Sequence, residues 1–140
     1  MGQIDYFAST DFGAGLLYIA HTLLEIVLGA VKLRGRYSAM QTPPGAERFV
    51  RHHGISLLAL AMLGCLVLGK RMVHTEFGKV ASATLAFFHA GAVMTMLHAW
   101  SQTGEGLNVA FTHAPFAIGF FLHGSYGSRP HREKGGFCVE

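Results

Sequence analysis

Four apolar segments alternate with short polar stretches along the chain. They cover residues 13–33, 53–73, 80–100 and 107–123, and each is hydrophobic around most of its helical circumference. A surface helix of a soluble bundle keeps a charged face, whereas a membrane-spanning helix is apolar on most sides. At a rise of about 1.5 Å per residue, roughly 20 residues cross the hydrocarbon core of a bilayer. The pattern predicts an all-α fold in one domain, an integral membrane four-helix transmembrane bundle.

The stretches between these segments agree with antiparallel neighbours. Residues 34–51 contain Pro43-Pro44-Gly45, which breaks a helix, and then an amphipathic run from Ala46 to Arg51 that leads into the second segment. Residues 70–79 and 101–106 are short enough to join antiparallel helices. Residues 124–140 form a Gly-rich basic tail, which we interpret as a solvated end, with docking to a partner or to anionic lipid as the alternative.

Composition supports the same class of protein. Of the 140 residues, 51% are hydrophobic and only 14% are charged, which is unusually apolar for a soluble domain of this size. We therefore expect a multi-pass integral membrane protein whose partners are the lipid bilayer and other membrane subunits or further copies of itself in a homo-oligomer. Basic residues are few and lie near the predicted membrane ends, so nucleic-acid binding is not expected. Lys and Arg are divided almost evenly between the two sides, and the positive-inside rule selects no orientation.

Polar residues inside the apolar segments carry the candidate chemistry. His21 and Glu25 lie one helical turn apart in the first segment, and the chain contains nine histidines. An ionisable residue at this depth costs at least ~2.5 kcal/mol and suggests a functional site. The helical rise places His21, Glu25, His89 and His113 in one central slab of the membrane. We therefore predict that these four side chains converge.

The spacing of polar residues indicates which helix faces look inward. On the first segment, six residues share one face at intervals of three and four: Tyr18, His21, Thr22, Glu25, Gly29 and Lys32. On the third segment, polar and soft side chains repeat every seven residues: Ser82, His89 and Met96. Both faces are expected to line the interior of the bundle and not to contact lipid.

The cluster admits several interpretations. His21, Glu25, His89 and His113 would form a metal site of two or three imidazoles and one carboxylate, or a proton relay. A b-type haem is a further alternative, with His21 and His89, or His89 and His113, as axial ligands. Room for that haem would come from three small residues: Gly29, Ala90 and Gly91. The structural alternative is that the histidines only form hydrogen bonds with Ser, Thr and carbonyl groups of neighbouring helices.

Several functions fit these patterns. The first expectation is a non-catalytic accessory subunit or oligomer-forming membrane component with a buried, histidine-rich cluster. The second is a protein that handles haem, metal ions or protons through that cluster. The third is a membrane-embedded enzyme acting on a lipid or quinone, for which only His21 and Glu25 offer an acid/base pair.

The end of the first apolar segment carries a family resemblance. Gly29-Ala30-Val31-Lys32-Leu33 resembles the G-x-x-K-L ending of the small four-helix DoxX-like membrane proteins, and the length and number of spans are similar. The chain lacks the Arg that often lies early in the first helix of that group. The resemblance implies a compact four-helix membrane bundle and identifies no activity.

Overall fold

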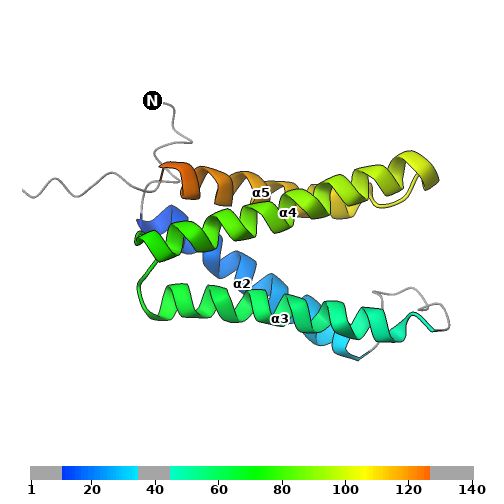
Figure 1. Ribbon diagram of the computed structural model, residues 1–140, viewed down its shortest axis with the longest axis horizontal. Coiled ribbons are helices and arrows are strands. Elements are labelled where there is room, and N and C mark those ends of the chain that lie inside the picture. Colours follow the sequence, from blue (N-terminus) through cyan, green and yellow to red (C-terminus); the bar gives the residue numbers. More distant parts are fainter. Residues whose placement is uncertain (1–10, 35–44, 127–140) are drawn as a thin grey trace, which may run out of the picture.

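Four antiparallel helices make up the described part of the protein. The computed structural model describes residues 11–34 and 45–126, and within these ranges it contains no strand. The helices are α2 (Asp11–Leu33), α3 (Glu47–Gly69), α4 (Glu76–Thr103) and α5 (Leu107–Tyr126). Each helix runs antiparallel to the one before it (Figure 1). The predicted all-α fold with four helices is confirmed.

The helix boundaries differ from the predicted segments at α3 and α4. Helix α3 begins at Glu47 instead of residue 53, because the amphipathic run after Ala46 continues directly into the apolar segment. It ends at Gly69, where Lys70 closes the last turn through its backbone N–H and Arg71 takes a left-handed conformation with φ 54°. The predicted second segment was therefore placed too far toward the C-terminus.

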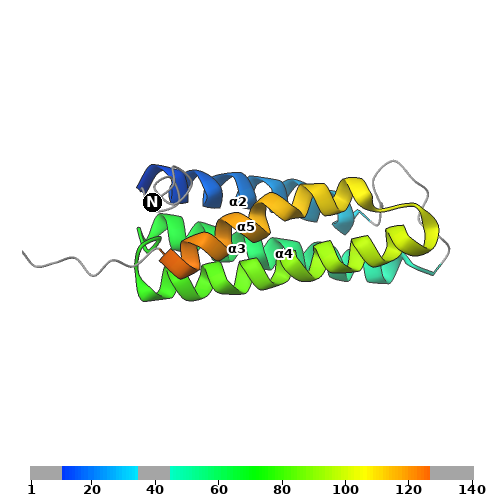
Figure 2. The same cartoon turned by 90° about the horizontal axis from the view of Figure 1, so that it is seen from above.

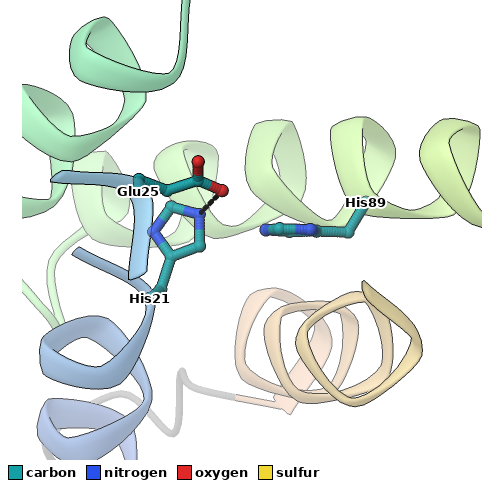
Figure 3. A group of neighbouring side chains, drawn as sticks. All are labelled: His21, Glu25 and His89. Carbon is teal, nitrogen blue, oxygen red and sulfur yellow. Dashed lines mark ion pairs between the residues drawn. The ribbon is translucent and has the colours of Figure 1, made fainter. Parts of the chain in front are cut away.

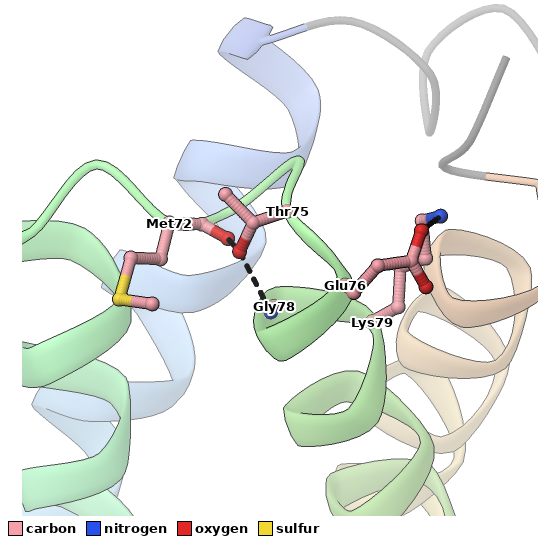
Figure 4. A network of polar contacts seen from close by, with 5 residues as sticks. All are labelled: Met72, Thr75, Glu76, Gly78 and Lys79. Atoms are coloured by element: carbon pink, nitrogen blue, oxygen red, sulfur yellow. Dashed lines mark hydrogen bonds and ion pairs between the residues drawn. The ribbon is translucent and has the colours of Figure 1, made fainter. Parts of the chain in front are cut away.

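A side-chain cap starts α4 earlier than the apolar pattern suggested. The Thr75 hydroxyl accepts a hydrogen bond from the Gly78 N–H at 3.2 Å and donates one to the Met72 carbonyl at 2.7 Å (Figure 4). An N-cap of this kind satisfies one of the otherwise unpaired amide groups of the first turn. Glu76 and Lys79 form an ion pair on the same turn. The helix consequently begins at Glu76 and not at residue 80.

The four helices are arranged as two pairs. Helices α2 and α3 pack against each other, as do α4 and α5, while contacts between the two pairs are few. The pairs meet at the end where α3 turns into α4 and diverge toward the other end (Figure 1). Seen from above, all four helices follow the long axis of the molecule (Figure 2).

The apolar core lies near the end where the pairs meet. Its fully buried side chains include Tyr18, Val67, Leu85 and Phe120. Farther along α4, the positions on the same face as His89 are only half-buried, as at Val93 and Met96. The interior is therefore closed around the first half of α4 and less covered beyond His89.

Three of the described helices are long and apolar enough to cross a membrane. Residues Gly13–Leu33, Glu47–Gly69 and Glu76–Thr103 meet the length and composition of a membrane span. Many large apolar side chains on these helices are exposed, including Leu23, Val27, Phe49, Met62, Val80 and Phe87. Helix α5, the fourth predicted span, does not meet that criterion. Of the predicted tail, 124–126 complete α5, and the remaining residues, 127–140, lie outside the described residues.

Candidate functional site: a buried histidine and glutamate cluster

Helix α2 supplies a buried polar face to the interior of the molecule. Tyr18, His21, Thr22 and Glu25 are each 5% exposed or less. Their spacing of three and four residues places them on one side of the helix, as the sequence predicted. Gly64 of α3 lies directly over Thr22, since a Cβ built at this glycine would be 2.1 Å from the Thr22 hydroxyl. Close packing of α3 therefore shields this polar face from the surroundings.

His89 of α4 completes a three-residue group with His21 and Glu25. The His21 Nε2 lies 3.4 Å from the Glu25 Oε1, and the His21 and His89 ring centroids are 4.9 Å apart and nearly perpendicular. Figure 3 shows His89 pointing from α4 toward the His21–Glu25 pair on α2. One ligand atom from each residue lies within 4.8 Å of the other two, and all three side chains are buried. The group has the residue types of a metal site.

Most polar atoms of this group have no hydrogen-bond partner. Within the described part of the chain, this holds for both His21 nitrogens, both Glu25 oxygens and the Nε2 of His89. A buried polar group left unpaired costs about 1–3 kcal/mol, and more when charged. The three residues come from two helices and each has one ligand atom close to those of the other two, so they are placed to share a bound ligand.

His113 of α5 lies beside this group. Its Nδ1 is 2.7 Å from the Nδ1 of His89, a hydrogen-bond distance, and the two ring centroids are 5.0 Å apart. His113 is half-buried, whereas His89 is fully buried. The structure thus brings together all four predicted residues, His21, Glu25, His89 and His113. Only the first three have ligand atoms that converge on one point.

His53 of α3 is a neighbour that the sequence did not single out. It lies within electrostatic range of Glu25, Lys32 and His113. The residue was overlooked because the second apolar segment was placed to start at this position. With α3 starting at Glu47, His53 lies in the second turn, so all four helices contribute ionisable groups to one region. If the second segment is extended back through the amphipathic run after Ala46, His53 lies inside the predicted helix and can be recognised as a neighbour of the cluster.

A second polar network lies closer to the end where the helix pairs meet. The Tyr18 hydroxyl donates to the Gly78 carbonyl at 2.9 Å and contacts the Ser82 hydroxyl at 2.7 Å. The Ser82 hydroxyl in turn lies 2.7 Å from the Nδ1 of His123. Here a buried histidine joins α5 to α4 through a hydrogen bond of its Nδ1. His123 therefore matches the structural interpretation in a way that His21 does not.

The Phe120 side chain separates the two polar regions. Its ring centroid is 5.1 Å from that of Tyr18 and 5.1 Å from that of His21. No hydrogen bond links Tyr18 to His21 across this ring in the ranges that the structure describes. The His21, Glu25 and His89 group is consequently a separate unit with its own chemistry.

The residues present do not fit a b-type haem. Phe116 and Phe120 pack against the rings of both His21 and His89, with centroid distances of 5.1–6.2 Å, and occupy the space that a macrocycle would need. The three small residues expected to provide room lie elsewhere: Gly29 packs against Leu58 and Gly54, while Ala90 and Gly91 are exposed. His89 and His113 also bond each other directly, which leaves no gap for iron between them.

The spacing of the three residues suits a single metal ion. Metal–nitrogen and metal–oxygen bonds of about 2.0–2.1 Å in tetrahedral geometry place ligand atoms roughly 3.3 Å apart. The observed 3.4 Å between His21 and Glu25 matches this value. The ligand atoms of all three residues lie within 4.8 Å of one another, which is somewhat wider than this spacing, so small shifts of the side chains would bring all three to an ion. Two imidazoles and one carboxylate would then hold the ion, with further coordination positions open.

Comparisons with protein-family models, curated proteins and solved structures find no match to this chain. The DoxX-like resemblance accordingly stays a prediction based on one short motif and the helix count. Function is therefore inferred from the geometry of the site.

Proposed function

We propose that this protein is a multi-pass integral membrane protein that binds one divalent first-row transition metal ion between its helices. His21, Glu25 and His89 are the proposed ligands. The observation that carries the proposal is the set of converging buried polar atoms without hydrogen-bond partners among the described residues.

The membrane assignment is supported by the three long apolar helices and by their exposed apolar side chains. We include α5 as a fourth span because it packs along α4 in the antiparallel direction. A helix that lies beside a membrane span over its length occupies the same depth of the bilayer. Its two histidines, His113 and His123, bond side chains of α4, and its lower hydropathy is thus compatible with a position inside the bundle.

Metal binding explains the cluster better than a purely structural role. A histidine that only joins helices is expected to use at least one nitrogen in a hydrogen bond, as His123 does between its Nδ1 and Ser82. The two nitrogens of His21 and the two oxygens of Glu25 lack such bonds within the described ranges. A cation would bind one nitrogen of His21 together with the carboxylate of Glu25, and the carboxylate would balance part of its charge.

The ligand types narrow the class of ion. Two imidazoles and a carboxylate are typical of zinc sites with an open position and of non-haem Fe(II) sites. Ca²⁺ and Mg²⁺ are disfavoured because they prefer oxygen ligands. Binding alone requires no substrate, so the proposal agrees with a non-catalytic membrane component that acts with partner subunits or as a homo-oligomer.

The test is the metal content of the purified protein. We expect the detergent-purified wild type to retain about one zinc or iron ion per chain after a wash with a weak chelator, as measured by inductively coupled plasma mass spectrometry. Glu25→Gln keeps the shape of the side chain and removes its charge, so it should lose most of the metal while the protein still elutes as a folded species. His21→Ala and His89→Ala should behave in the same way.

His98→Ala is the matched control, because His98 is an exposed histidine of α4 away from the cluster. It should retain the wild-type metal content. Equal metal in wild type and Glu25→Gln, or none in the wild type after reloading with Zn²⁺ and Fe²⁺, would contradict the proposal.

A further inference from the structure

The hydrogen bond between His89 and His113 joins the same atom of each ring. Both partners use Nδ1, at a separation of 2.7 Å, so one of the two nitrogens carries the hydrogen and the other accepts it. The bond therefore has two possible directions, and each direction fixes the tautomer of both neutral rings.

The metal site selects between these directions. The Nδ1 of His89 is engaged by His113, and its Nε2 lacks a hydrogen-bond partner in the described structure. Nε2 is therefore the nitrogen that remains for binding an ion together with His21 and Glu25. A neutral imidazole binds a metal through the nitrogen without hydrogen. His89 must therefore carry its hydrogen on Nδ1 and donate it to His113.

We propose that His113 is a positioning residue that accepts this hydrogen bond and thereby presents the Nε2 lone pair of His89 to the ion. This inference rests on the proposed metal site and refines the predicted role of His113, which the sequence suggested as a direct ligand. His113 then carries its own hydrogen on Nε2. Partners of this kind orient the ligating ring, and their loss costs about 10- to 100-fold in metal affinity.

The position of His113 agrees with this role. Its Nδ1 is engaged by His89, and the residue lies on α5, outside the group whose ligand atoms converge. Phe88 lies on one side, with a ring centroid 6.4 Å from that of His113, and so helps to hold the ring in place. The acceptor is therefore packed in position before an ion binds.

The inference is tested by Co²⁺ titration of the purified full-length protein, following the visible d–d absorption. His113→Phe removes the acceptor and should weaken Co²⁺ binding about 10- to 100-fold, with the same number of ions bound at saturation and the same band pattern. His113→Asn supplies a carbonyl acceptor from a shorter side chain and should restore much of the affinity. His98→Phe is the control for an exposed histidine of α4 and should bind as the wild type does.

The outcomes separate this inference from the proposed function. If wild type binds no Co²⁺, the metal site itself is wrong. If wild type binds Co²⁺ and His113→Phe binds it equally well, only the role of His113 is overturned. Loss of a band characteristic of the ligand set in both His113 variants would also overturn it, because His113 would then be a ligand.

A measurement on the unmodified protein covers the case in which the variants do not fold. Nitrogen-15 NMR of the Zn²⁺-loaded wild type, labelled at histidine, distinguishes the two tautomers of each ring. We expect His113 to carry hydrogen on Nε2 and His89 on Nδ1. The opposite assignment would contradict the inference.

Discussion

At the scale of residues, two buried histidines show two different uses of the same side chain. His123 receives a hydrogen-bond partner for its Nδ1 from Ser82, and this bond joins α4 to α5. His21 has no such partner for either nitrogen within the described residues, although it is just as deeply buried. The difference lies in the neighbours, since His21 faces Glu25 and His89 instead of a hydroxyl group.

The burial of polar atoms without hydrogen bonds has an energetic cost in this cluster. Each unpaired buried polar atom costs about 1–3 kcal/mol, and a whole domain is stable by only about 5–15 kcal/mol. The His21 Nε2 and the Glu25 Oε1 form an ion pair at 3.4 Å, whereas the His21 Nδ1, the Glu25 Oε2 and the His89 Nε2 have no hydrogen-bond partner within the described residues, and their burial lowers the stability. A shared cation would satisfy one atom of each of the three residues, which is the physical reason to expect a ligand here.

The sequence was informative about which residues form the cluster and less so about their roles. Depth along each helix and the three-and-four spacing of α2 were enough to bring His21, Glu25, His89 and His113 together. The rotation of α5 about its axis, which decides whether His113 meets the ion or His89, is set by packing between helices. No local pattern of residues reports that rotation.

At the scale of elements, α2 and α3 cross with their backbones in close contact. A Cβ built at Gly54 would lie 2.9 Å from the Gly29 carbonyl oxygen and 2.9 Å from the Leu33 backbone nitrogen. Both atoms belong to the backbone of α2 and cannot rotate away. The two helices can approach this closely only because Gly54 has no side chain, and this approach positions α3 over the polar face of α2.

We expect Gly54→Ala to destabilise the protein, because α3 must move away from α2 to make room for the methyl group. Overpacking of this kind costs about 1–3 kcal/mol, which exceeds the gain of about 0.5–1 kcal/mol from replacing glycine in a helix. Thermal unfolding in detergent should show a lower midpoint. Gly91→Ala is the matched control, since a Cβ there meets nothing within 4 Å, and its midpoint should stay equal or rise. A Gly54→Ala protein as stable as Gly91→Ala would argue against the close crossing.

The four helices could be predicted because each apolar segment is longer than the apolar stretches found in surface helices of soluble proteins. Their ends could not, since they depend on single contacts. The Thr75 cap extends α4 at its start, and an amphipathic run after Ala46 lengthens α3. The earlier start of α3 also places His53 inside the helix, as a neighbour of the site.

At the scale of the whole molecule, the two helix pairs place the cluster where the interior changes from closed to open. The pairs meet at the end where α3 turns into α4 and diverge toward the other end (Figure 1). Tyr18 and Phe120 belong to the buried core, whereas α4 is only half-buried beyond His89, as at Val93 and Met96. His113 is half-buried and His53 exposed on the more open side. An ion would therefore reach the cluster from that side, past these two histidines.

The four-span arrangement predicts the membrane side of each loop. Accessibility tags in residues 70–75 and at either terminus should report the same side of the membrane, with a tag in residues 35–44 on the opposite side. Within the described residues, three helices are long and apolar enough to span a membrane. If only these three did so, the C-terminus would lie on the opposite side from the N-terminus. Labelling of single cysteines in intact and permeabilised cells distinguishes the four-span arrangement from the three-span arrangement. Termini on opposite sides would remove α5 from the membrane and contradict the bundle.

X-ray absorption at the metal edge tests the central claim most directly, because it reports the atoms bound to the ion. For the wild-type protein loaded with one Zn²⁺ per chain, we predict a first shell of nitrogen and oxygen at about 2.0–2.1 Å with the outer-shell scattering of two imidazoles. His89→Ala, loaded under the same conditions, should lose one imidazole from that pattern or lose the ion. A wild-type spectrum without imidazole scattering, or one unchanged in His89→Ala, would contradict a metal centre built by His21, Glu25 and His89.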